Sequence, residues 1–503
     1  MMQLKKRYSL LGAAAVVLAS ACNNFDVTNP NQPDIQRALS SPADVKSLAQ
    51  STVRSWYMTS VSGGPEDGQN GEPDPQVFGC VTADVCTMNY GNFGARFNNL
   101  EPRVAYENSS SGGDRTVAEI PWDHNYGTIG AANDVLRAIK GGLSLGSADE
   151  TEKYKEEAQF TQAASYLYLS MEFDQAFVVT ENNVPAVPPT LVPHAEVRDS
   201  TMRMWDALIA ASAQHSYTYD VTDLPMPDGA LTSTRINRLA NTMAAMTLAY
   251  HPRTAAQAAT VDWARVAAYA DKGIGTGSAG TPFDVVVQND ANQWVSLLMA
   301  YGDLIDWVRT DHRVIHRMNP SVLAKYDGTD PPAGSSPDAR YTTDYEYVAP
   351  PVGDPGRGIY MQSDWYHKRY AFANWYSTTA LAGNVPYMLA AESDLIRAEA
   401  LIRSGGNLQT AADLINNTRV GRGNLPPATG GDGAATLLIY ISYERDVEIT
   451  NTSGTTLYWR RAVTDQPLQA GTACQLPIPA KELETLGLAI YTFGGVGNDA
   501  NCK

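Results

Sequence analysis

The stretch LAAESDLIRAEALIRSGGNLQTAADLINNTRV, residues 389–420, decides the fold of this chain. Apolar residues and alanines recur in it at spacings of three and four, which places them on one face of a helix. Ser404, Gly405 and Gly406 interrupt this spacing, and it resumes at Leu408, as expected for a turn between two helices. The stretch therefore predicts a helical hairpin whose alanines let the two helices approach closely.

Two more segments show the same pattern. Residues 122–136 and 158–173 form one predicted hairpin, and residues 236–249 and 263–270 form another, with Pro252 between its helices. A helix over 202–213 would add a fourth pair. Residues 263–269 also approximate the tetratricopeptide consensus. Because such hairpins stack on their neighbours, we expect an all-α, mostly helical fold with a tetratricopeptide-like scaffold.

Two long segments interrupt this helical pattern, residues 63–115 and 280–376. Both lack a helical period and contain many aromatic residues, which are phenylalanine and tyrosine in the first segment and mainly tyrosine and tryptophan in the second. Long irregular segments in compact domains are usually functional or disordered, and binding residues concentrate on loops that a rigid frame holds in place. We therefore expect a loop-rich second layer that carries the ligand surface.

The N-terminus predicts export and membrane attachment. Lys5, Lys6 and Arg7 precede an apolar run over residues 10–18, which is about half the length that a membrane-spanning helix needs. Small residues at 19–21 then lead to Cys22, and this arrangement resembles a bacterial lipobox. We expect a signal peptide over 1–21 and acylation of Cys22. An ordinary secretory signal is the alternative.

A tether and a single large body should follow the signal. Residues 22–40 are rich in Asn and Pro, which is typical of an extended linker. The body, residues 41–503, divides into an N-terminal half (41–275), an aromatic ligand layer (276–386) and a C-terminal helical part with a tail (387–503).

The acidic composition argues against polyanionic partners. The formal net charge is -17, and removal of residues 1–21 takes away three cations and no acids, which brings it to -20. No cluster of Lys and Arg lies beyond the signal. A surface of this charge repels nucleic acid and anionic lipid, so we expect no nucleic-acid partner, whereas neutral ligands remain compatible.

Four cysteines follow Cys22, an even number for an exported protein, and they allow three pairings into two disulfides. We favour the local pairings, Cys80 with Cys86 and Cys474 with Cys502. A zinc site is the alternative, but neither pair has the short spacing that zinc sites favour.

Motifs for other chemistry are weak. Residues 275–280 match G-x-G-x-x-G, but this segment follows a predicted helix instead of a strand, so we expect a plain loop. His312 and His316 would share a helical face, although Arg313 stands where a metalloprotease has Glu. We expect no catalytic residue, no cofactor and no metal. Paired carboxylates of a glycoside hydrolase leave no sequence signature, so a lipid-anchored hydrolase remains the alternative function.

The irregular segments offer rings beside hydrogen-bonding side chains, a combination that can stack on a sugar and bind its hydroxyls. The candidate ligand residues are Tyr90, Asn292, Trp294, Asp364, Trp365 and Tyr366. The alternative is that these rings fill the core of the second layer, as aromatic side chains often do.

The C-terminal third carries five short motifs in a fixed order. They are E-x2-L-I-R-A-E-A at 392–400, A-x3-I-N-x2-R at 411–419, Y-E-R-x2-E at 443–448, W-R-R at 459–461 and P-I-P-x2-E-L at 477–483. In order and spacing they resemble the SusD/RagB family of outer-membrane nutrient-binding lipoproteins. The charged and amide residues within them should cap helices or pair with one another; these are Glu399, Asn416, Arg419, Glu444 and Arg445.

This resemblance implies a SusD-like fold and a binding function. It implies an outer-membrane lipoprotein, facing the cell surface, that captures an oligosaccharide or a peptide without bond chemistry. It also implies a partner, a SusC-like TonB-dependent barrel that takes up the captured nutrient.

Overall fold

Helices dominate the computed structural model. It describes residues 38–62, 75–89, 97–98, 100–183, 189–290, 292–296, 308–329, 333–351, 362–371, 382–452 and 455–498. Cys22, the signal and most of the tether lie outside these ranges. Among the described helices, none is both long enough and apolar enough to cross a bilayer.

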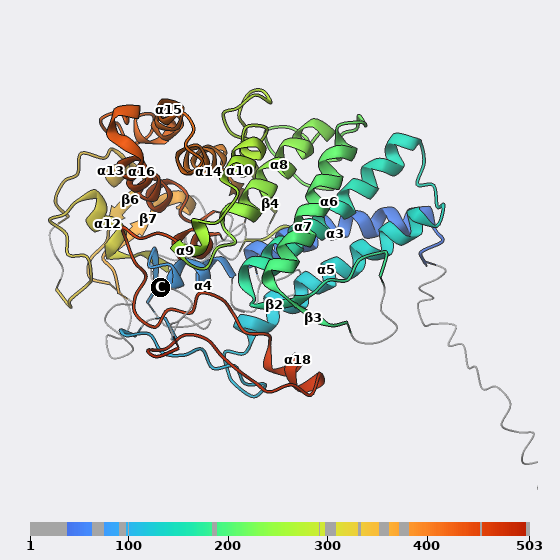
Figure 1. Ribbon diagram of the computed structural model, residues 1–503, viewed down its shortest axis with the longest axis horizontal. Coiled ribbons are helices and arrows are strands. Elements are labelled where there is room, and N and C mark those ends of the chain that lie inside the picture. The colour runs from blue at the N-terminus through green and yellow to red at the C-terminus, as the bar shows by residue number, and fades with distance from the viewer. Residues whose placement is uncertain are drawn as a thin grey trace, which may run out of the picture.

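The longer helices form a continuous stack. They are α3 (Pro42–Ser62), α5 (Thr116–Lys140), α6 (Ala148–Glu172), α7 (His194–Ser212), α8 (Ser233–Ala249), α10 (Trp263–Ala270), α14 (Ala390–Arg403), α15 (Leu408–Arg419) and α16 (Gly433–Glu448). From α5 to α15, each of these helices packs against the next along the chain. Figure 1 shows the series running from α3 and α5 at one end of the long axis to α14, α15 and α16 at the other. The three predicted hairpins are confirmed, and α7 packs between α6 and α8.

Local residues set the ends of these helices. Side-chain oxygens accept a backbone N–H in the first turn of several helices, as N-caps do; the caps are Ser147 for α6, Thr232 for α8, Asp262 for α10 and Asn407 for α15. Gly405 has a φ of +73° between α14 and α15, a backbone conformation that glycine adopts without strain. The predicted turn at 404–406 is therefore present.

Short strands and helices make up the remaining elements of the described chain. In the described residues, four antiparallel pairs of strands occur: β1 (Cys86–Met88) with β5 (Val308–Thr310), β2 (Gln175–Phe177) with β3 (Leu191–Pro193), β4 (Val285–Asp290) with β8 (Ala382–Met388), and β6 (Tyr345–Tyr347) with β7 (Trp365–His367). The short helices are α4 (Pro75–Thr82), α9 (Ala255–Ala258), α12 (His312–Met318), α13 (Arg340–Thr343), α17 (Thr456–Arg460) and α18 (Ala480–Thr485), with 3₁₀ turns η5 (Lys368–Tyr370) and η6 (Gly430–Asp432).

These elements correct the expectation that residues 63–115 and 280–376 are wholly irregular. Strands β1, β5 and β7 have three residues each, and all of them are buried. A strand this short shows no alternation of polar and apolar residues, so its pattern could not be recognised from sequence.

Aromatic side chains join the scaffold to the second layer. Trp56 of α3 packs edge-on against Phe160 of α6 and against Tyr387 of β8, with ring centroids 4.9 Å apart in both pairs. Such pairs stabilise a core beyond the area that they bury. The two layers therefore share one hydrophobic core.

Two buried arginines fasten distant segments to the helical stack through backbone oxygens. Arg461 donates hydrogen bonds to the carbonyls of Met171, Tyr250, His251, Pro252 and Cys474 at 2.7 to 3.1 Å. Arg253 donates to the carbonyls of Ser170 and Phe173 at 2.8 and 3.0 Å. Burial lowers the pKa of Arg461 to about 9, because desolvation disfavours the charged form.

The charged residues of the C-terminal motifs serve the structure, as predicted. Arg445 pairs with Glu399 at 2.7 Å, and both side chains are nearly inaccessible. Asn416 bonds the backbone of Ala428 in both directions, at 2.9 and 2.8 Å. Glu444 pairs with Arg340 of the second layer at 2.7 Å. One of these ion pairs thus joins two of the motif residues, and the other reaches outside the motifs.

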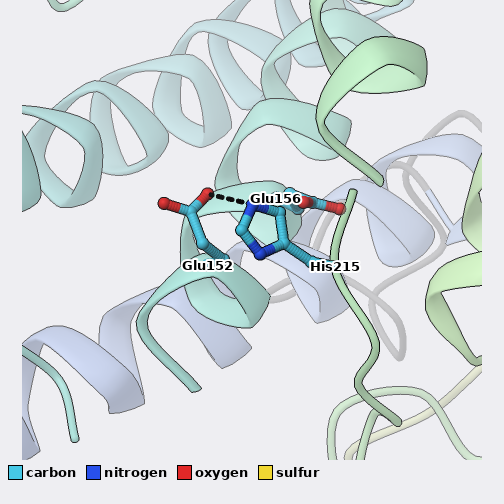
Figure 2. A group of neighbouring side chains, drawn as sticks. All are labelled: Glu152, Glu156 and His215. Carbon is cyan, nitrogen blue, oxygen red and sulfur yellow. Dashed lines mark ion pairs between the residues drawn. The ribbon is translucent and has the colours of Figure 1, made fainter. Parts of the chain in front are cut away.

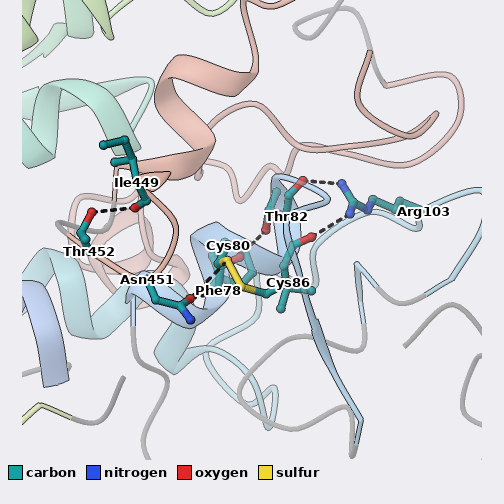
Figure 3. Close-up of a disulfide and its surroundings, with 9 residues drawn as sticks. Phe78, Cys80, Thr82, Cys86, Arg103, Ile449, Asn451 and Thr452 are labelled. Atoms are coloured by element: carbon teal, nitrogen blue, oxygen red, sulfur yellow. Dashed lines mark hydrogen bonds between the residues drawn. A yellow bond between two sulfur atoms is a disulfide. The ribbon is translucent and has the colours of Figure 1, made fainter. Parts of the chain in front are cut away.

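A disulfide closes the turn between α4 and β1. Cys80 and Cys86 are bonded, which is the local pairing that we favoured. Figure 3 shows the bond beside Asn451, whose Oδ1 lies 3.5 Å from the sulfur of Cys86. On the other side, Arg103 donates to the carbonyl of Thr82. Asp84 of this small loop accepts hydrogen bonds from the backbone N–H and the side-chain amide of Gln469 at 3.1 and 2.7 Å, which hold the loop to the C-terminal part of the chain. Cys474 is also disulfide-bonded, and its expected partner Cys502 lies outside the described residues.

Candidate functional site

A polar pocket of about 420 Å³ opens where the second layer meets the C-terminal helices. Its walls come from six separate parts of the chain: Asp284, then Thr343 and Asp344, then His367, Lys368 and Arg369, then Leu389, then Arg422, and finally Glu448. The turn from α13 to β6, the end of β7 and the last residue of α16 hold most of these side chains. In Figure 1 these elements gather at the α14–α16 end of the molecule.

Arg422 forms two ion pairs within the charged wall. Its Nη2 lies 2.7 Å from Oδ2 of Asp344, and its Nε lies 3.2 Å from Oε1 of Glu448. The Arg422 side chain is 52% exposed, whereas the two carboxylates are mostly buried. The guanidinium therefore faces solvent while its partners fix its position, and it has donors left for a ligand.

His367 contributes a neutral, buried imidazole to the wall. Burial, and then the positive charges of Arg369, Arg422 and Lys368, hold the pKa of its imidazole well below the ordinary value. Its Nδ1 accepts a hydrogen bond from the backbone N–H of Arg369 at 3.1 Å, which puts the ring proton on Nε2. Among the described residues, Nε2 has no hydrogen-bond partner, and the atom is itself buried, so the imidazole shapes the wall without offering an open donor.

The pocket thus combines donors and acceptors of both charges. Guanidinium and ammonium groups stand beside carboxylates. A sugar hydroxyl can donate a hydrogen bond to a carboxylate and accept one from a guanidinium or an ammonium group. No Trp, Tyr or Phe of the described residues lines the pocket. Recognition here would depend on hydrogen bonds.

The predicted ligand residues 364–366 lie directly beside this pocket but point into the protein. Trp365 and Tyr366 are each 2% exposed, and Asp364 is fully buried. The ring of Trp365 packs against Tyr341 and Tyr347, with centroids 4.7 and 5.4 Å away. A ring this enclosed offers no face to a sugar in this structure. This placement agrees with the alternative stated above, that these rings fill the core of the second layer. Strand β7 nevertheless carries His367 to the pocket wall.

The predicted residues near position 294 form a separate turn. Trp294 is 6% exposed and lies 5.5 Å from the ring of Tyr57. Asn292 is exposed, and Oδ1 of Asp290 accepts the backbone N–H groups of Asn292 and Trp294 at 2.9 Å. Neither residue lines the polar pocket. Tyr90 lies outside the described residues.

Burial of aromatic rings is general in this protein. Every Trp, Tyr and Phe among the described residues is either buried or only partly exposed. In the described part of the chain, the molecule therefore has no fully open aromatic platform on which a sugar could stack.

The two weak sequence motifs, the histidine pair at 312 and 316 and the glycine-rich segment 275–280, are held by contacts with the backbone. The Nδ1 atoms of His312 and His316 lie 3.2 and 2.7 Å from the carbonyls of Leu323 and Val322. Residues 275–280 form a loop between α10 and β4, as expected, and Asp394 accepts the backbone N–H of Thr276. Neither arrangement faces the polar pocket.

Sequence reasoning missed Asp284, Asp344, Arg422 and Glu448. These residues are far apart along the chain, and none stands in a motif that indicates ligand binding. The only local signal was the run His367-Lys368-Arg369, which directly follows the predicted Trp365 and Tyr366.

No protein-family model and no curated protein matches the chain. Solved structures, in contrast, do match the chain. A SusD superfamily protein from Parabacteroides distasonis is 14% identical, with a TM-score of 0.61 over 91% of this chain and 98% of that one. A SusD-like carbohydrate-binding protein from Bacteroides fragilis is 15% identical, with a TM-score of 0.58 over 84% and 87%. Surface glycan-binding protein A from Bacteroides uniformis is 14% identical, with a TM-score of 0.55 over 81% and 85%. The protein therefore has the mostly helical SusD-like fold.

Proposed function

We propose that this protein binds a nutrient oligosaccharide in the polar pocket and performs no bond chemistry on it. The observation that carries the proposal is the half-exposed guanidinium of Arg422, which two buried carboxylates hold beside the neutral imidazole of His367. Two solved proteins of the same fold are described as carbohydrate-binding or glycan-binding, which supports this ligand class. A peptide is the other class that such a pocket accommodates.

The same proposal includes a place in the cell. The lipobox-like sequence before Cys22 and the tether to residue 40 support acylation and attachment to the outer membrane, with the body facing the cell surface. Delivery would be to a SusC-like TonB-dependent barrel. The resemblance of the C-terminal motifs and the SusD-like fold support this partner.

Replacement of Arg422 tests the ligand site. We expect the purified wild-type body to retain at least one glycan of a panel without releasing product, and Arg422→Ala to weaken that binding at least about tenfold, or roughly 1.4 kcal/mol. Isothermal titration calorimetry measures the affinity, and chromatography of the incubated glycan detects cleavage. Arg137→Ala is the matched control, because Arg137 pairs with Asp134 on α5, outside the pocket.

Two results would contradict the proposal. Product release by the wild type would identify the glycoside hydrolase alternative. Equal affinity of Arg422→Ala and Arg137→Ala would place the glycan elsewhere on the protein.

Replacement of Cys22 tests the anchor and the partner. We expect Cys22→Ala to abolish incorporation of labelled fatty acid and to move the protein out of the membrane fraction. A large β-barrel should co-purify with the wild type from gently solubilised membranes. Unchanged acylation of Cys22→Ala would overturn the proposed anchor, and purification of the protein without any barrel would overturn the proposed partner.

A further inference from the structure

Three side chains that can bind a metal meet where α6 passes the loop after α7. Glu152 and Glu156 are four residues apart on α6, so they share one face of the helix. His215 lies three residues beyond the end of α7. One ligand atom from each of the three residues lies within 4.8 Å of the others. Figure 2 shows both glutamates approaching the imidazole of His215 from α6.

Glu156 carries an oxygen that lacks a partner. Its side chain is fully buried, and Oε1 has no hydrogen-bond partner among the described residues. The other oxygen, Oε2, accepts a hydrogen bond from the hydroxyl of Tyr217. Buried polar atoms in folded proteins are rarely left unsatisfied, and a cation bound beside His215 would satisfy this one.

The surroundings orient the imidazole toward the carboxylates. Nε2 of His215 lies 3.9 Å from Oε2 of Glu152, while Nδ1 lies 3.9 Å from Oδ1 of Asp149. Asp149 can thus orient the imidazole of His215 through Nδ1, and the hydroxyl of Tyr217 fixes the carboxylate of Glu156. Outer-shell groups orient metal ligands in the same way. Lys155 lies 2.9 Å from Oε2 of Glu152, but its side chain is 33% exposed, so it can move into solvent.

We propose that Glu152, Glu156 and His215 bind Zn²⁺ and thereby fasten α6 to the connection between α7 and α8. One imidazole nitrogen and two carboxylate oxygens form a three-ligand set that zinc accepts, with water in the fourth position. Magnesium and calcium prefer oxygen ligands alone. Glu152 and His215 are 24% and 29% exposed, so the ion can enter from solvent.

Titration of the full body with Zn²⁺ after treatment with a chelator tests this site. We expect one Zn²⁺ per chain by calorimetry, a higher thermal midpoint with Zn²⁺ than without it, and visible absorption bands of four-coordinate Co²⁺ when Co²⁺ is used instead. His215→Ala should weaken Zn²⁺ binding at least about tenfold, as loss of an outer-shell group already does at known sites, and it should abolish the rise in the thermal midpoint. Mg²⁺ and Ca²⁺ should not raise the midpoint.

Two further variants complete the experiment. His124→Ala on α5 should bind Zn²⁺ like the wild type, which separates this site from adventitious binding by the other histidines. Glu156→Gln should lose affinity as His215→Ala does; if this variant does not fold, the partly exposed His215 still decides the question. Absence of saturable Zn²⁺ binding by the wild type, or equal binding by His215→Ala, would overturn the proposal.

Discussion

Arg340→Ala should lower the free energy of unfolding by about 3–5 kcal/mol, because it leaves buried carboxylates without their counter-ion. The Arg340 side chain is fully buried. Its guanidinium lies 2.8 Å from Asp338, 2.7 Å from Glu444 and 3.2 Å from Glu448. Burial alone would lower its pKa, but these carboxylates raise the pKa above the ordinary value, so the arginine stays charged and paired.

Equilibrium unfolding in urea, followed by circular dichroism, measures this effect. Arg137→Ala is the control, since Arg137 and its partner Asp134 are both about one third exposed and such a surface pair contributes roughly 0–1 kcal/mol. A loss below about 1 kcal/mol for Arg340→Ala would show that the carboxylates can be satisfied without the guanidinium. Since Glu448 also contacts Arg422, this variant should weaken glycan binding as well.

Trp365→Ala should also destabilise the protein strongly, by about 3–5 kcal/mol, which is typical when a buried tryptophan is truncated to alanine. The physical reason is the packing of the ring against Tyr341 and Tyr347, which the truncation would replace with a cavity. Urea unfolding gives the stability change. Trp365→Phe keeps part of the packing and should therefore lose less.

Glycan affinity of the same variants decides between the two roles considered for Trp365. Affinity is measured under conditions in which both variants are folded. If Trp365→Ala kept its stability within about 1 kcal/mol and lost glycan binding, the ring would contact ligand and the packing interpretation would be wrong.

The scaffold could be predicted from sequence because its information is local. The alanines and apolar residues of 389–420 are spaced by the helical repeat itself, and the turn at Gly405 stands beside the helices that it joins. The apolar residues of α5 and α6, and those of α8 and α10, are likewise spaced by the helical repeat. Helix α7 was expected over 202–213 but begins at His194, because its first turns are polar and show little apolar period.

The binding surface could not be predicted in the same way. Arg422 and Asp344 are 78 residues apart and meet only in the tertiary fold, so no spacing along the chain encodes that contact. Tryptophan and tyrosine in an irregular segment suit either a ligand platform or a core, because their large apolar faces are buried favourably in both. Burial decides between these roles, and burial depends on the tertiary fold.

The carbonyl contacts of Arg461 constrain how a nascent chain can mature. Its guanidinium contacts the backbone of Met171 and Tyr250, which are 290 and 211 residues away along the chain. During synthesis these contacts can form only after residue 461 has been made. Truncation before residue 461 should therefore leave α6 and the end of α8 without this fastening.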